Sequence, residues 1–259
     1  MHLRIDYSYS QITLALRSTT PHRHRRRRRL QQTFSIMAAT PDQAPYTAPA
    51  LFDSLGPAYE DAYSDNPEQT ASIEWLLAEL AKPARILDVG CGTGRPVCAT
   101  LSEAGHSVLG IDVSRVMISA ARERAPKAKF QQVDHREFES RPNVYDAITV
   151  YFSLILDLTQ EEIRDSLRKF YDWLKPGGLF VFATVPIAGN KLEMKWMGRP
   201  VVVSGFAAED VVAAVKEAGF EVVKEKAMVF MPRAVEVGIC EAEDISEEPF
   251  LFVYAKKNV

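Results

Sequence analysis

The sequence has few of the residues that build disulfide frameworks or metal sites. Its 259 residues include three cysteines, Cys91, Cys98 and Cys240, and five histidines, and no two cysteines form a Cys-x-x-Cys pair. These numbers argue against a disulfide-stapled domain and against a zinc site, and they fit a reducing compartment. We therefore expect no bound metal.

Long apolar runs are also missing. No stretch approaches the roughly 18 consecutive apolar residues that suggest a transmembrane helix, so we expect no membrane span. With 47% hydrophobic and 25% charged residues, the chain has the proportions of a globular protein. This composition excludes a collagen-like or a wholly disordered protein.

Basic residues are scarce outside the N-terminus. Residues 1–40 contain eight arginines and one acidic residue, whereas residues 41–259 contain 23 lysines and arginines against 33 acidic residues. A nucleic-acid-binding protein needs a basic face that neutralises phosphates. The only dense basic run, residues 23–29, lies outside the expected fold, so we expect no nucleic-acid partner.

We expect residues 1–45 to form a disordered, arginine-rich extension and residues 46–259 to form one domain. The extension has the composition of a mitochondrial transit peptide, but its basic run is also typical of a nuclear import signal. A third interpretation is an over-extended gene model, with Met37 as the true start. The expected location is cytoplasmic, or mitochondrial if residues 1–36 are a transit peptide.

From residue 67 onward, helical and strand patterns alternate. Asn66 before Pro67, Ser114, and Thr159 with Glu162 three residues on are helix-start signals. Strands separated by helices of 10 to 15 residues predict right-handed crossovers and a mostly parallel sheet covered on both faces. The expected strands are 85–89, 108–111, 130–133, 145–151 and 179–185, with a turn at 175–178, and the expected helices are 67–82, 96–104, 114–125, 159–174 and 208–218. Residues 221–230 and 250–256 have no comparable helix between them, which predicts a C-terminal antiparallel hairpin.

The sharpest motif is residues 86–96, Ile-Leu-Asp-Val-Gly-Cys-Gly-Thr-Gly-Arg-Pro, where a strand meets a helix. Glycines at alternate positions let the backbone turn tightly and approach a ligand, and the following helix presents free N–H groups. Eighteen residues after Gly94, Asp112 ends the next strand, where a carboxylate accepts hydrogen bonds from ribose hydroxyls. This combination predicts a site for a nucleotide-like cofactor.

The loop favours a cofactor without a pyrophosphate. A dinucleotide fingerprint requires a third glycine at position 95, and Arg95 occupies it. The loop then faces an amino acid moiety, with Asp88 available to meet an ammonium group. A cofactor with both a ribose and an amino acid end is S-adenosylmethionine.

These motifs resemble those of the class I S-adenosylmethionine-dependent methyltransferases. The matching segments are 87–94, 110–112 with Ser114 and Met117, 130–134, 145–147 and 174–178, and the resemblance covers about residues 46–256. It implies a doubly wound, Rossmann-like α/β fold with a seven-stranded sheet, mostly parallel with a C-terminal antiparallel hairpin, and S-adenosyl-L-methionine as cofactor.

The resemblance also assigns roles to single residues. It implies that Asp88 and the loop 90–94 bind the methionine half, Asp112 the ribose, and Asp134 with His135 the adenine, while an aromatic N-terminal segment folds over the cofactor. The expected cofactor-binding residues are Asp88, Gly90, Cys91, Gly92, Gly94, Asp112, Val113, Met117, Asp134, His135, Tyr151, Tyr59 and Tyr63. An ordinary packing face is the competing explanation for Phe52, Tyr59 and Tyr63. His106 is expected at the surface.

The acceptor is expected to be a small, hydrophobic or aromatic molecule. Methyl transfer is an in-line displacement that positioning alone can accelerate, so no catalytic base is assigned. Candidates for the acceptor pocket are Tyr151, Ser153 and Trp196, the last within residues 187–203, which look like a substrate hairpin; the competing explanation is a solvated loop with Trp196 and Met197 in the core. The acceptor atom and the oligomeric state stay open.

Two other functions compete with the enzyme. One is a catalytically weak, methyltransferase-like regulator that acts with a partner, for which the arginine run would be an import signal. The other is a nicotinamide-dependent oxidoreductase, against which Arg95 weighs. Within the methyltransferase hypothesis, a mitochondrial quinone-pathway enzyme competes with a cytosolic enzyme of specialised (secondary) metabolism.

Overall fold

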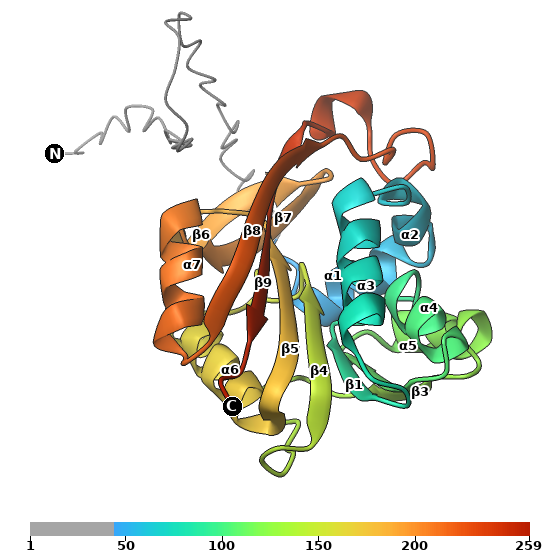
Figure 1. The fold of residues 1–259 in the computed structure, drawn as a ribbon. Coiled ribbons are helices and arrows are strands. Elements are labelled where there is room, and N and C mark those ends of the chain that lie inside the picture. The colour runs from blue at the N-terminus through green and yellow to red at the C-terminus, as the bar shows by residue number, and fades with distance from the viewer. Residues whose placement is uncertain (1–43) are drawn as a thin grey trace, which may run out of the picture.

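The computed structural model describes residues 44–259, so nearly all of the expected N-terminal extension lies outside the described residues. Seven strands form one sheet in the order β3-β2-β1-β4-β5-β9-β8, and β6 and β7 form a separate pair (Figure 1). The helices are α1 (Ala48–Leu55), α2 (Ala58–Ala62), α3 (Pro67–Glu79), α4 (Val97–Glu103), α5 (Arg115–Arg124), α6 (Gln160–Trp173), α7 (Ala208–Glu217) and a 3₁₀ turn, η1 (Ala242–Asp244). The strands are β1 (Arg85–Val89), β2 (Ser107–Asp112), β3 (Lys129–Gln132), β4 (Tyr145–Tyr151), β5 (Leu174–Thr184), β6 (Gly189–Trp196), β7 (Arg199–Gly205), β8 (Glu221–Phe230) and β9 (Glu248–Lys256).

The fold class predicted from the sequence is confirmed. Strands β1 to β5 pair in parallel, whereas β9 pairs antiparallel with both β5 and β8. The order reverses between β1 and β4, because the chain leaves β1 toward β2 and β3 and then returns to the other side. The loops after β1 and β4 therefore diverge at one edge of the sheet and open a crevice there, which is where ligands bind in open α/β sheets.

Helices cover both faces of the sheet. One apolar core joins α3, α4 and α5 to one face, with Ile73, Leu101 and Ile118 buried against it. The other joins α6 and α7 to the opposite face through Phe170 and Val215, among others. The ribbon shows these two helix layers on either side of the central strands (Figure 1). This sandwich explains why the central strands are apolar on both faces.

The helix-start signals are confirmed by the side-chain contacts. The Asn66 side chain accepts from the backbone N–H groups at the start of α3, and Ser114 accepts from Met117 N. Thr159 and Glu162 form the expected reciprocal capping box at the start of α6. Each contact satisfies backbone donors that would otherwise lack a partner in the first helical turn.

Two local predictions are wrong. Residues 175–178, expected as a turn, lie within β5, which begins at Leu174 with a register shift against β4. His106, expected at the surface, is only 5% exposed, and its Nδ1 accepts a hydrogen bond from Ala84 N at 3.1 Å. Burial and the nearby Lys82 lower the pKa of His106, so the ring is neutral and serves as a backbone partner.

Two further segments extend from the carboxyl edge of the sheet. Helices α1 and α2 precede the sheet in the chain and lie over this edge, and we call them, together with Tyr63 at the end of α2, the lid. The pair β6–β7, which we call the hairpin, follows β5 and confirms the hairpin expected at residues 187–203. Within the hairpin Met197 is buried, as in the competing loop interpretation, whereas Trp196 is only half-buried.

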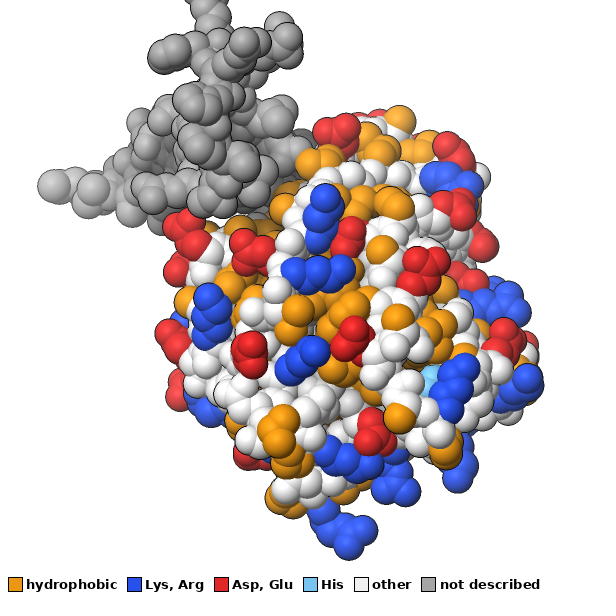
Figure 2. Space-filling model, viewed as in Figure 1, with side chains coloured by type: hydrophobic (Ala, Val, Ile, Leu, Met, Phe, Trp, Pro, Cys, Tyr) orange, Lys and Arg blue, Asp and Glu red, His pale blue; other side chains and the backbone are white. Residues whose placement is uncertain are grey.

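Charged side chains of both signs are interspersed with hydrophobic ones on the face in Figure 2. None of the helices described for residues 44–259 is long and apolar enough to cross a membrane.

Candidate functional site

The glycine loop after β1 is held by the end of β2. Gly90 N and Cys91 N both donate to Ile111 O, at 2.8 and 3.0 Å. Gly90 has φ of +71°, and a Cβ there would lie 2.1 Å from Ser153 Cβ. Gly92 also has a positive φ, but a Cβ there would meet nothing within 4 Å. Glycine at 90 is thus needed for packing, whereas glycine at 92 leaves open space above the loop.

Asp112 faces this open space from the end of β2. Its Oδ2 accepts from Gly92 N at 2.9 Å and its Oδ1 from Ser114 N at 2.8 Å. The side chain is nearly buried, and burial raises the pKa of Asp112 although these two backbone bonds oppose the rise. The carboxylate is therefore held in one orientation, with lone pairs left for a further donor.

A small cleft of about 90 Å³ lies between the glycine loop, Asp112 and the lid, and we call it the loop cleft. It brings together most of the residues predicted to bind the cofactor. Of these, Gly90, Gly92, Asp112, Val113, Met117, His135, Tyr151 and Tyr59 line it, together with Ala48, Phe52, Val89, Ile111, Val133, Phe152, Ser153 and Leu156. The predicted residues Asp88, Cys91, Gly94, Asp134 and Tyr63 do not line it.

Asp88 lies behind the loop rather than in the cleft. Its carboxylate accepts from Thr149 Oγ1 at 2.7 Å and from Cys98 Sγ at 3.2 Å, inside the core. Burial raises the pKa of Asp88 to about 6, against the effect of those two bonds. Cys91 is also buried, and its thiol pKa is raised, so it is not an activated nucleophile.

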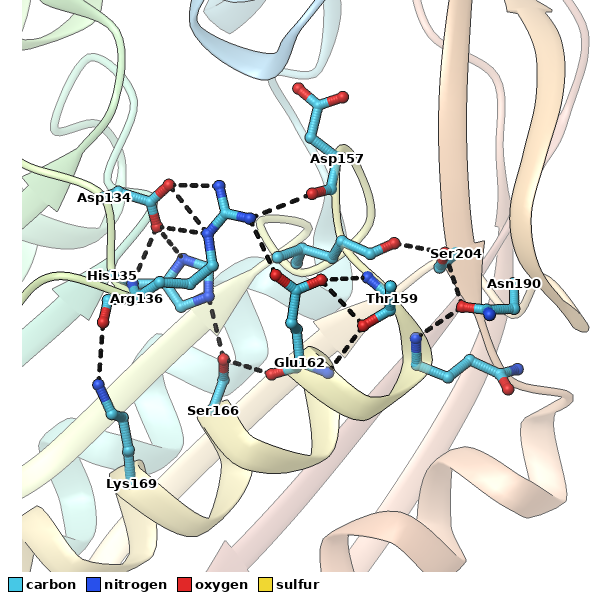
Figure 3. Close-up of polar contacts among 12 residues, drawn as sticks. Asp134, His135, Arg136, Asp157, Thr159, Glu162, Ser166, Lys169, Asn190 and Ser204 are labelled. Atoms are coloured by element: carbon cyan, nitrogen blue, oxygen red, sulfur yellow. Dashed lines mark hydrogen bonds and ion pairs between the residues drawn. The ribbon is translucent and has the colours of Figure 1, made fainter.

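Asp134 and His135 belong to a polar network after β3 (Figure 3). Arg136 pairs with Asp134, with 2.6 Å between Nη2 and Oδ2, whereas His135 Nε2 lies 3.0 Å from Ser166 Oγ. Burial lowers the pKa of His135 to about 4, so its ring is neutral where it lines the cleft. Partial burial alone would raise the pKa of Asp134. The hydrogen bonds from Arg136 outweigh this effect, so the pKa is lowered and the carboxylate stays ionised.

A second cavity of about 240 Å³ lies beside the loop cleft, between the lid, the hairpin and the start of β9. We call it the apolar cavity. Phe52, Tyr59, Phe152 and Leu156 line both spaces, so the two share one wall. The rest of the lining is Tyr63, Ile155, Val185, Ile187, Met194, Lys195, Trp196, Met197, Val201, Val203, Glu243, Asp244, Ile245, Ser246, Glu248 and Phe250.

The three residues predicted for the acceptor pocket have different orientations. The Tyr151 hydroxyl lies 2.7 Å from Ser72 Oγ in the core, so only its ring reaches the loop cleft. Ser153 lies two residues after the end of β4, and its Oγ donates to Val89 O at 2.8 Å, which fixes this segment to the end of β1, where the glycine loop begins. Trp196 alone lines the apolar cavity.

Sequence reasoning missed Glu248, the buried carboxylate of the apolar cavity. Glu248 is 8% exposed; it accepts from Trp196 Nε1 at 2.8 Å and from Tyr63 Oη at 2.9 and 3.0 Å. The sequence contains a signal, because Glu248 is two residues before Phe250 and four before Phe252. Alternation along a strand puts these three side chains on one face, and the other two are buried.

Comparison with known proteins agrees with this geometry. A family model described as a methyltransferase domain matches residues 86–178, which run from β1 into β5. A putative methyltransferase, YqeM, from Bacillus subtilis is 29% identical over 51% of this chain and 54% of its own length. A 24-methylenesterol C-methyltransferase from rice, Oryza sativa, is 31% identical over 64% of this chain and 50% of its own. The chain thus spans about half the length of these curated relatives.

Solved structures share the fold. A 1,6-didemethyltoxoflavin-N1-methyltransferase from Burkholderia thailandensis superimposes with a TM-score of 0.57 at 20% identity, covering 87% of this chain and 99% of that one. The family model covers the strand, loop and acidic strand end that build the loop cleft. The sequence motifs, the sheet order and these matches agree, and together they support a class I methyltransferase with S-adenosylmethionine as its cofactor.

Proposed function

We propose that the protein is a methyltransferase that uses S-adenosylmethionine to methylate a small, apolar or aromatic acceptor. The observation that carries this proposal is the shared wall between the loop cleft and the apolar cavity. The loop cleft offers the Asp112 carboxylate and the backbone of the glycine loop among apolar side chains. The apolar cavity is lined mainly by aromatic and aliphatic side chains, with a smaller polar part that includes Lys195, Asp244 and Glu248. A polar cofactor and an apolar acceptor would therefore meet at Phe52, Tyr59 and Phe152.

The residues of the loop cleft fit the cofactor. Asp112 would accept hydrogen bonds from the ribose hydroxyls. The apolar side chains of Val113 and Met117 would contact the adenine, and the loop backbone at Gly92 would lie against the methionine half. Open space above Gly92, which a Cβ would fill, supports this assignment. When bound, S-adenosylmethionine supplies a methyl group on a positively charged sulfur.

The lid must move when a molecule of nucleoside size enters, because Ala48 and Phe52 of α1 close the loop cleft to about 90 Å³. Asp53 holds α1 in place: its carboxylate accepts from Ser114 Oγ at 2.6 Å and from Val116 N at 3.2 Å. The hydrogen bond from Ala48 N to Asp157 Oδ2 and the buried side chains of Leu51 and Leu55 also hold α1, so its displacement must break these contacts too. A closed lid would exclude water and hold the reacting groups in line.

The apolar cavity supports an acceptor without extended charge. Two similar proteins point the same way, since the rice enzyme is named for a sterol and the Burkholderia enzyme was solved with bound 1,6-didemethyltoxoflavin. Both are small ring compounds. A formed acceptor cavity also favours an enzyme over a catalytically weak regulator.

The test is calorimetric titration of the purified chain with S-adenosylhomocysteine, with NADH in parallel. We expect micromolar binding of S-adenosylhomocysteine by the wild type, strong weakening in Asp112→Ala, and no weakening in Asp210→Asn, which changes an exposed carboxylate on α7. NADH should not bind. Binding of NADH instead, or equal affinity in wild type and Asp112→Ala, would contradict the proposal.

A further inference from the structure

The apolar cavity contains one buried carboxylate that lacks a cationic partner. Glu248 has no lysine, arginine or histidine nitrogen within 4 Å among residues 44–259, although ion pairs are present elsewhere, including Lys195 with Asp244 on the same cavity wall. Its hydrogen bonds come from two neutral donors, Tyr63 and Trp196. Burying a carboxylate without a cation costs more free energy than burying a neutral amide, because the ion loses its hydration and gains no opposite charge in return.

The carboxylate also has unused acceptor capacity. Oε1 accepts from Trp196 and Tyr63, whereas Oε2 receives only the second, 3.0 Å branch of the Tyr63 hydrogen bond. An ionised carboxylate offers about four lone-pair sites. At least one site on Oε2 therefore has no donor from the described residues, and the side chain lines the cavity.

A structural role explains only part of this arrangement. Glu248 does connect the lid, through Tyr63, to the hairpin, through Trp196, and so helps to close the cavity. A glutamine would make the same connection, since its carbonyl oxygen accepts from the indole and its amide donates to the tyrosine oxygen. The negative charge of Glu248 is therefore not needed to connect the lid to the hairpin. A hydrogen-bond donor on a molecule in the cavity would interact favourably with that charge.

We propose that Glu248 accepts a hydrogen bond from an N–H or O–H group of the acceptor. It would thereby restrict the acceptors to apolar molecules that bear one such group. This inference rests on the proposed function and adds the polar feature of the substrate class. The carboxylate would fix one end of an otherwise apolar molecule, and the aromatic wall shared with the loop cleft would hold the rest.

The surroundings of Glu248 set its charge. Burial raises the pKa of Glu248 to about 6, although the Trp196 and Tyr63 hydrogen bonds oppose this. Facing it are Tyr59 and Tyr63 from the lid, both with raised pKa and hence neutral, Lys195 from the hairpin, which is paired, and Glu243 and Asp244 from η1. The carboxylate is consequently ionised at pH 8 and largely protonated at pH 5.

The experiment compares two probes of nearly equal shape, 2-naphthol, which donates a hydrogen bond, and 2-methylnaphthalene, which does not. Their affinities for the full chain are measured by NMR titration at pH 5 and pH 8. Hydrogen bonds to charged groups contribute about 1.5–3 kcal/mol, so we expect the wild type to prefer 2-naphthol by about tenfold or more at pH 8. The preference should fall several-fold at pH 5.

Two variants make the test specific. Glu248→Gln keeps the connection between lid and hairpin but should have a small preference that does not change with pH. Glu247→Gln removes the same charge from the exposed neighbouring residue, which does not line the cavity, and should behave as the wild type. An equal preference in wild type and Glu248→Gln, or no preference in the wild type, including no binding of either probe, would overturn the inference.

S-adenosylhomocysteine is titrated into the same samples. Equal affinity in all three proteins is expected, because Glu248 does not line the loop cleft. If S-adenosylhomocysteine binds but the probe preference is absent, the assignment of Glu248 fails and the proposed function stands. If S-adenosylhomocysteine does not bind the wild type, the proposed function fails.

Discussion

Replacing Gly90 by alanine tests whether the glycine loop is held by its contact with Ser153, which lies just after β4. The new Cβ would lie 2.1 Å from Ser153 Cβ and 2.8 Å from Ser153 Oγ. Rotation of the Ser153 side chain cannot relieve this clash, because its Cβ is attached directly to the backbone. The loop or the segment after β4 must shift, and this shift would also break the hydrogen bond from Ser153 Oγ to Val89 O.

The cost of Gly90→Ala has two parts. Alanine at φ of +71° costs roughly 1–2 kcal/mol, and overpacking of a close contact costs about 1–3 kcal/mol. The free energy of unfolding should therefore fall by about 2–5 kcal/mol, which corresponds to a fall in Tm of roughly 5–20 °C for a domain of this size. Thermal unfolding followed by circular dichroism measures this change.

Gly238→Ala is the matched control. Gly238 has φ of +76°, and a Cβ there would meet nothing within 4 Å, so only the backbone cost of about 1–2 kcal/mol applies. If Gly90→Ala lowers Tm no more than Gly238→Ala does, the packing argument for the loop is wrong.

Three more predictions concern the cleft and the cavity. Gly92→Ala fills open space in the loop cleft without a clash, so it should weaken S-adenosylhomocysteine binding by at least tenfold in calorimetry while lowering Tm far less than Gly90→Ala; unchanged affinity would contradict this. Tyr151→Phe removes the hydroxyl that forms a hydrogen bond with Ser72 in the core. It should lower the free energy of unfolding in urea by about 1 kcal/mol and leave the cofactor affinity unchanged. A loss of affinity would show that the hydroxyl contacts the ligand. The folded-state pKa of Glu248, about 6, lies above its ordinary 4.5, so its contribution to stability is present below pH 4.5 and lost as pH rises through 6. As pH rises from 4.5 to 6, the free energy of unfolding of Glu248→Gln should accordingly increase by about 2 kcal/mol relative to that of the wild type. A stability difference between the two proteins that does not change with pH would refute the pKa shift.

The sequence predicted the features that depend on local patterns. The caps at Asn66, Ser114 and Thr159 act within one helical turn, and the strand–helix alternation required a parallel sheet. The glycine loop and Asp112 were predicted to meet because consecutive parallel strands bring their carboxyl ends to one edge. These predictions needed no knowledge of contacts between distant residues.

The features that sequence reasoning missed depend on such distant contacts. His106 is buried because Ala84, which is 22 residues earlier, supplies a backbone donor. The Tyr151 hydroxyl points to Ser72 on α3, and nothing in the strand pattern says which way it points. Glu248 was missed because β9 begins two residues before the predicted start, which left the carboxylate in an expected loop.

The most direct test of the central claim is a crystal structure of the chain with S-adenosylhomocysteine. We expect the ligand in the loop cleft, with its ribose hydroxyls within hydrogen-bond distance of Asp112 and with α1 displaced to admit it. Its sulfur should point toward the wall formed by Phe52, Tyr59 and Phe152. A ligand bound elsewhere, or a ribose that does not contact Asp112, would contradict the account.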